Sequence, residues 1–237
     1  MTPEITVLCL SAAAIAFVHT LLGPDHYLPF VAMARARGWA IDKTLKITLV
    51  CGIGHLAGSI ALGLIGIYLG LTLSSLEWVE GVRGNLSAWL MIGFGLAYMV
   101  WGLRQAWKNR PHSHWHVHDG VAHSHEHVHR SEHAHVHENK GNTHSLAPWV
   151  IFVILVLGPC EPLIPLLMYP AARESILGVV LVTVVFGVVT VLAMILAVAA
   201  AYLGLRSVRL KPLERYGHAL AGSVILMCGL AVSLLGI

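Results

Sequence analysis

Charged residues are scarce in this chain, which excludes an ordinary soluble domain. Only 11% of the 237 residues are Asp, Glu, Lys or Arg, whereas 57% are hydrophobic. Soluble domains carry about 25% charged residues, so this composition leaves too little polar surface to face water. The sequence therefore predicts an integral membrane protein whose main partner is the lipid bilayer. We expect neither enzymatic activity nor binding to nucleic acid.

Cysteine is also scarce, and its spacing argues against a disulfide framework. The chain has four cysteines, Cys9, Cys51, Cys160 and Cys228, scattered through apolar segments without a C-x-x-C pair. We interpret three of them as packing residues. Cys160 differs from the others because it precedes Glu161 in a segment interrupted by proline.

Basic residues are missing from the start of the chain, since no Lys or Arg precedes Arg35. The first apolar segment thus lacks the basic start of a signal peptide, and we expect it to remain as a spanning helix. A membrane core of about 30 Å takes about 20 apolar residues to cross. Six segments meet this length: 4–22, 45–73, 86–107, 146–169, 175–205 and 217–236. We expect the third of them, 86–107, to hold no charge inside the membrane.

The distribution of basic residues predicts the orientation. Of the 15 Lys and Arg residues, only Arg83 and Arg173 fall in the even-numbered loops, which leaves 13 for the odd-numbered loops. Short loops rich in Lys and Arg stay in the cytoplasm. We therefore expect a protein of the cell (inner) membrane with both termini outside and the loop between the third and fourth helices inside.

The sequence repeats itself at an offset near 134 residues, which predicts two related halves. Three helices followed by three related helices must enter the membrane from opposite sides, as in many secondary transporters. We expect an all-α membrane protein with six transmembrane helices arranged as a 3+3 inverted repeat. The first repeat is 1–110, the second is 146–237, and the loop 111–145 lies between them. Helices 1 and 4 are expected to be broken. The matching segments are Leu22–Pro24 with Leu157–Pro159, Tyr68–Gly70 with Tyr202–Gly204, and Gly95–Ala97 with Gly229–Ala231.

Both breaks place ionisable residues at membrane depth. Gly23 and Pro24 precede Asp25 and His26, and the second break contains Cys160 and Glu161 beside prolines. An intramembrane carboxylate is costly and marks a functional site by default. Asp25 could instead only cap the half-helix that follows the break.

Nitrogen, oxygen and sulfur donors in these segments predict a site for a divalent transition metal. The metal would be the transported substrate, nickel or cobalt first and zinc second, and we expect no organic cofactor. His55 belongs to the following helix, among small residues that permit close helix approach. The candidate ligands are Asp25, His26 and His55, then His19 and Glu161, and finally Cys160.

A histidine-rich stretch separates the two halves and holds 12 of the 16 histidines. Such a segment builds no core, so we expect it to lack fixed structure without a ligand. Imidazole suits nickel, cobalt, copper and zinc, and a pH-responsive linker is the alternative. The histidines are His112, His114, His116, His118, His123, His125, His127, His129, His133, His135, His137 and His144.

These motifs resemble a superfamily of small membrane transporters. His19 with Asp25 and His26, and Gly54-His55 with Ser59, are similar to two motifs of the nickel/cobalt permeases, whose efflux relatives also carry a His-rich loop. Urease-accessory-type and sulfite-exporter-like proteins belong to the same superfamily. The segment Gly158–Pro165 also resembles the cysteine segment of its thiol-disulfide electron carriers, which pair two cysteines.

The resemblance implies a metal permease, with efflux slightly favoured over import. A metallochaperone or a second copy of the chain is a further partner to consider. Three alternatives stay open: a thiol-disulfide electron carrier acting through Cys160, an exporter of a sulfur oxyanion, and a membrane accessory that delivers metal without transporting it.

Overall fold

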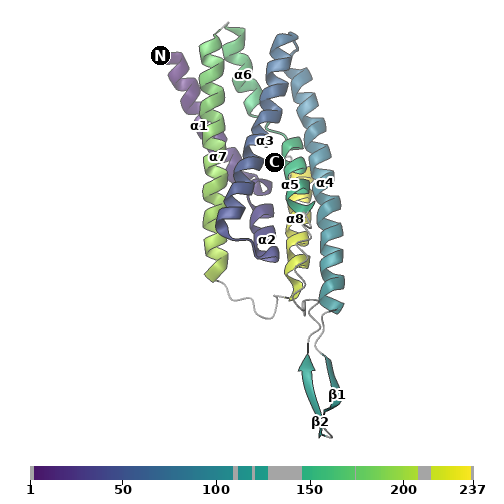
Figure 1. Ribbon diagram of the computed structural model, residues 1–237. Coiled ribbons are helices and arrows are strands. Elements are labelled where there is room, and N and C mark those ends of the chain that lie inside the picture. The colour runs from purple at the N-terminus through teal and green to yellow at the C-terminus, as the bar shows by residue number, and fades with distance from the viewer. Residues whose placement is uncertain are drawn as a thin grey trace.

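The protein is an all-helical membrane protein in its described core, seen here in a computed structural model (Figure 1). The structure describes residues 3–108, 112–118, 121–127, 146–173, 175–207 and 215–235. Among them, five helices are long and apolar enough to cross a membrane. The elements are α1 (Pro3–Leu22), η1 (Pro24–His26), α2 (Leu28–Arg37), α3 (Ile41–Tyr68), α4 (Leu73–Lys108), β1 (His112–His118), β2 (Val121–His127), α5 (Leu146–Leu157), α6 (Leu163–Ala172), α7 (Ile176–Ser207) and α8 (Gly217–Leu235).

The two predicted breaks are present. Helix α1 ends at Leu22, and Pro24, which has no backbone N–H, opens the single turn η1. The predicted span at 146–169 is two short helices, α5 and α6, separated by residues 158–162. Neither short helix reaches the length of a span, so the fourth predicted helix is interrupted rather than continuous.

The third predicted span, 86–107, is too short and its expected lack of charge is wrong. Helix α4 begins at Leu73, and its first half carries Glu80 with no exposed surface. Arg83, which the sequence suggests is a loop residue, lies one turn further along the same helix.

Glycines allow α4 and α8 to pack closely. A Cβ atom on Gly95 of α4 would lie 2.8 Å from Leu226 Cα and 2.9 Å from the Gly222 carbonyl of α8. Small residues let membrane helices approach until their backbones touch. Gly93 faces away from this contact, and a Cβ atom added there would have nothing within 4 Å.

Two clusters of buried side chains flank the breaks. One contains Phe30 of α2 and Met194 of α7, with Cys51 and Cys228 buried among them. The other contains Phe186 of α7 and the fully buried Cys160. All four cysteines are free thiols.

The histidine-rich stretch forms an antiparallel hairpin over part of its length. Strands β1 and β2 extend beyond the helical bundle at the end where α4 finishes (Figure 1). Because these residues form two paired strands, the expectation that they lack fixed structure is wrong for this part of the stretch. The register places histidine opposite histidine at three positions. The paired positions are His112 with His127, His114 with His125, and His116 with His123, whereas His129, His133, His135, His137 and His144 lie outside the described residues.

Candidate metal centre

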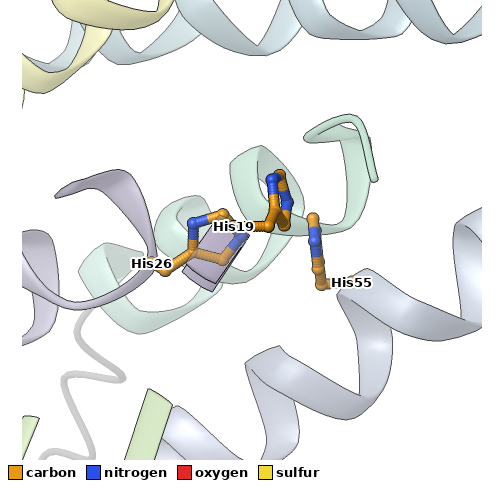
Figure 2. A group of neighbouring side chains, drawn as sticks. All are labelled: His19, His26 and His55. Atoms are coloured by element: carbon orange, nitrogen blue, oxygen red, sulfur yellow. The ribbon is translucent and has the colours of Figure 1, made fainter. Parts of the chain in front are cut away.

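Three histidines from three separate elements meet inside the bundle. His19 comes from the last turn of α1, His26 from η1 and His55 from the middle of α3. One nitrogen of each lies within 4.8 Å of the others, so a single ion could contact all three. Figure 2 shows the rings together, with centroids 5.0 Å apart for His19 and His26 and 5.1 Å apart for His26 and His55.

The break in the first helix brings His19 and His26 together. The Gly23 N–H donates to the His19 carbonyl at 3.0 Å, which completes the last turn of α1, and the His26 N–H then donates to the Gly23 carbonyl at 3.1 Å. A Cβ atom at Gly23 would overlap the His26 ring and lie 2.9 Å from Asp25 Oδ1. Glycine is therefore needed here so that the chain can fold His26 back toward His19.

Hydrogen bonds at Nδ1 leave Nε2 available on two of these rings. His55 Nδ1 lies 2.9 Å from the Leu155 carbonyl, and His26 Nδ1 lies 3.2 Å from the Gly23 carbonyl. A carbonyl only accepts, so each Nδ1 carries the proton and each Nε2 presents a lone pair. A histidine held in this way by a backbone carbonyl is the usual arrangement of a metal ligand.

Among the residues that the structure describes, the buried Nε2 atoms of all three histidines have no hydrogen-bond partner. Leaving a buried polar atom without a partner costs about 1–3 kcal/mol. Three such atoms on rings that lie close together are best explained by a ligand that accepts nitrogen lone pairs. The donor set therefore fits a metal ion.

Asp25 supplies negative charge beside the triad. It is buried, and its Oδ1 lies 3.2 Å from His26 Nδ1 without forming a hydrogen bond. A carboxylate here offsets the charge of a bound cation, whereas the Gly23 carbonyl orients the His26 ring. Whether Asp25 ligates the metal directly stays a prediction, because the nitrogen cluster does not include it.

The segment around the second break reaches the triad through a backbone carbonyl, that of Leu155, which binds His55 Nδ1, and in the described part of the chain its side chains Cys160 and Glu161 do not join the group of close ligand atoms. Cys160 is fully buried, and its N–H donates to Glu80 Oε2 at 3.2 Å. Glu161 is exposed. Neither residue belongs to the group of close ligand atoms found among the described residues, and their ligand roles stay predictions.

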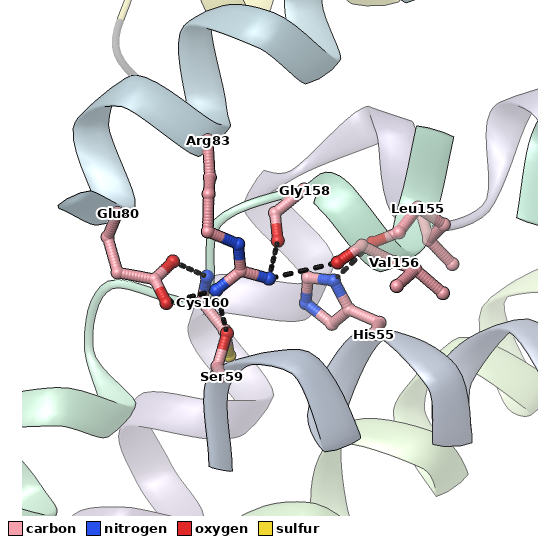
Figure 3. Close-up of polar contacts among 8 residues, drawn as sticks. All are labelled: His55, Ser59, Glu80, Arg83, Leu155, Val156, Gly158 and Cys160. Atoms are coloured by element: carbon pink, nitrogen blue, oxygen red, sulfur yellow. Dashed lines mark hydrogen bonds and ion pairs between the residues drawn. The ribbon is translucent and has the colours of Figure 1, made fainter. Parts of the chain in front are cut away.

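Sequence reasoning missed a partly buried ion pair beside this break. Arg83 forms an ion pair with Glu80, and its guanidinium also donates to the Val156 carbonyl at 2.9 Å and to Ser59 Oγ at 3.3 Å (Figure 3). The Glu-x-x-Arg spacing, one turn apart on a helix, was the available signal. It was lost because the predicted span began after both residues.

Of three comparisons with known proteins, one found a match, which supports the membrane character and leaves the substrate open. No curated protein matches the chain. No solved structure matches it either. Residues 29–231, most of the chain, match the family described as the cytochrome c biogenesis protein transmembrane region, and the chain belongs to that family.

Proposed function

We propose that this protein is a secondary transporter of a divalent transition metal that binds at His19, His26 and His55. The observation that carries the proposal is the grouping of three histidines, one ring nitrogen of each within 4.8 Å of the others, whose buried Nε2 atoms have no hydrogen-bond partner among the described residues. Imidazole with a neighbouring carboxylate suits nickel, cobalt or zinc better than calcium or magnesium, which prefer oxygen ligands. Nickel or cobalt is our first choice because of the resemblance of these motifs to the permeases.

Two reciprocal contacts support an inverted repeat of six spans, with α5 and α6 acting together as one span. A Cβ on Gly95 would meet the Gly222 carbonyl and the Leu226 backbone, and one on Gly229 would meet the Ala88 carbonyl and the Ile92 backbone. At the offset of 134 residues, Gly95 corresponds to Gly229, and its partners Gly222 and Leu226 correspond to Ala88 and Ile92, the partners of Gly229. Each half therefore presents corresponding residues to the other, as a two-fold axis requires.

The histidine-rich stretch would gather metal on the cytoplasmic side. In Figure 1 the hairpin lies at the end of the bundle where α2, α4 and α7 finish. In the described part of the chain, this end carries Arg35 and Arg37 of α2, Lys43 and Lys46 of α3, and Arg104 and Lys108 of α4, as expected for a cytoplasmic face. A metal-binding stretch there would supply ions for export, which is the direction we favour, and an ion gradient would provide the energy.

Metal flux into vesicles tests this function. Proteoliposomes of known orientation should move nickel or cobalt faster than empty liposomes, with zinc slower and sulfite not transported. Flux would be followed by a metal-sensitive dye trapped inside. Transport of sulfite without metal would favour an oxyanion exporter, and metal binding without flux would favour a delivery accessory; either result would contradict the proposal.

The family match favours a second candidate, an electron carrier that uses thiol chemistry at Cys160. The matched family is named for cytochrome c biogenesis, and its match covers Cys160 but not His19, Asp25 or His26. Against this candidate, Cys160 is fully buried, and the corresponding position of the first break is Asp25 rather than a second cysteine.

Replacing Cys160 with serine separates the two candidates. A transporter that binds metal at the three histidines is expected to keep at least about half of its flux, because these ligands are unchanged and a buried hydroxyl in place of the thiol costs only about 1–3 kcal/mol of folding free energy. An electron carrier would lose all thiol exchange with a partner. The measurement pairs metal flux with trapping of mixed disulfides, and Cys228→Ser is the control. A mixed disulfide at Cys160 in the parent protein would favour the carrier.

A further inference from the structure

The C-terminal end of α5 is held by side chains from two other helices. The last carbonyls of a helix have no partner within it. Here Ser87 Oγ donates to the Ile154 carbonyl at 2.9 Å. His55 Nδ1 donates to the next carbonyl, that of Leu155, at 2.9 Å. Arg83 donates to the carbonyl after that, at Val156, also at 2.9 Å. Three successive carbonyls thus each receive a donor from α3 or α4.

The Glu80–Arg83 pair binds the backbone on both sides of Pro159. Arg83 lies at the C-terminal end of α5, which carries partial negative charge, and reaches the Val156 carbonyl and, at 3.5 Å, the Gly158 carbonyl. Glu80 accepts from the Cys160 N–H at 3.2 Å, three residues before α6 begins. One ion pair therefore joins the end of α5 to the middle of the break (Figure 3).

This bridge is adjacent to the bond that orients His55. The Leu155 carbonyl, which fixes the proton of His55 on Nδ1, precedes the Val156 carbonyl bound by Arg83. Arg83 also donates to Ser59, one turn after His55 on α3. Movement of the break would therefore shift the carbonyl that aims His55 Nε2 at the other two histidines.

We propose that the Glu80–Arg83 pair is a positioning pair that holds the backbone from Leu155 to Cys160, which comprises the end of α5 and the start of the break, and thereby sets the geometry of His55 for metal binding. The inference rests on the proposed function of the triad. The pair does not contact the metal; it acts through the backbone of the break.

The test measures Co²⁺ binding to the full chain in detergent, with the loop histidines replaced by glutamine so that the absorption of Co²⁺ reports on the triad. The variants are Arg83→Gln and the double variant E80Q/R83Q, which leaves no buried charge unpaired. We expect Co²⁺ affinity to fall about tenfold or more, as for other outer-shell changes, with altered visible bands. Arg83→Lys keeps the charge but not the planar fork and should give an intermediate loss.

The controls are exposed residues of the same helix, Glu77→Gln and Arg104→Gln, which should bind Co²⁺ as the parent does. A second readout needs no metal: with Cys160 as the sole cysteine, its alkylation by a maleimide should be at least about tenfold faster in E80Q/R83Q, because the break is no longer held.

The outcomes separate this inference from the proposed function. Parent protein that fails to bind Co²⁺ would overturn both. If the parent binds Co²⁺ and the folded double variant binds it with the same affinity and spectrum, the positioning role is overturned while the metal site stands. Unchanged alkylation of Cys160 would show that the pair does not hold the break.

Discussion

Replacing His26 with alanine is expected to weaken Co²⁺ binding more than about a hundredfold, beyond the roughly 10- to 100-fold loss caused by changes outside the ligand shell. The His26 ring is close to both other rings, with centroids 5.0 Å from His19 and 5.1 Å from His55. Its removal leaves two histidine nitrogens, a weaker donor set than three. The same background without loop histidines would be titrated with Co²⁺, and metal flux would be measured in parallel.

His218→Ala is the matched control for this prediction. His218 is also a histidine of a membrane helix, but it lies on α8, where its Nδ1 is 2.8 Å from the Tyr98 hydroxyl. It is not among the three grouped histidines. We expect the His218 variant to bind Co²⁺ within about twofold of the parent, because it loses one neutral hydrogen bond, about 1 kcal/mol of folding free energy, and ring contacts with Tyr98 and Trp101, all away from the triad. Equal losses in both variants would argue against the triad as the metal site.

The sequence was most informative where backbone chemistry decides the structure. Gly23 and Pro24 could be recognised as a helix break because proline lacks an N–H and glycine permits close approach. The equivalent break at Gly158 followed from the repeat. In contrast, the start of α4 was placed too late, because Glu80 and Arg83 lower the hydropathy of its first half. Their charges satisfy each other inside the fold, which a hydropathy window does not register.

The site was predicted in part, for a physical reason. His19, His26 and His55 were all among the candidate ligands, and the structure brings them together. Glu161 was chosen as an intramembrane carboxylate in the second break, yet it is exposed while the adjacent Cys160 is buried. Residues adjacent in an irregular segment point in directions that depend on turn geometry, and the sequence does not specify these directions. The contribution of Leu155, a backbone carbonyl that orients His55, has no side-chain signature at all.

Replacing Gly95 with alanine is expected to lower the free energy of unfolding by about 3 kcal/mol or more, at or above the usual range for overpacking. The added methyl group would lie against the Leu226 backbone and 2.9 Å from the Gly222 carbonyl. Backbone atoms of a helix move only if the whole helix moves, so α8 would have to shift away from α4. If the inverted repeat holds, Gly229→Ala should cause a similar loss, because its added methyl group meets the corresponding backbone atoms of Ala88 and Ile92.

Gly93→Ala is the control that separates overpacking from a general effect of alanine in this helix. Gly93 is on the same helix, and a Cβ there would have nothing within 4 Å. Alanine is the better helix former, so this variant should be unchanged or more stable by about 0.5–1 kcal/mol. Unfolding would be followed by circular dichroism in detergent with increasing denaturant. Equal stability of the Gly93 and Gly95 variants would contradict close packing of α4 on α8, and a loss at Gly95 without one at Gly229 would argue against the repeat, because a two-fold axis requires both glycines to occupy the same environment.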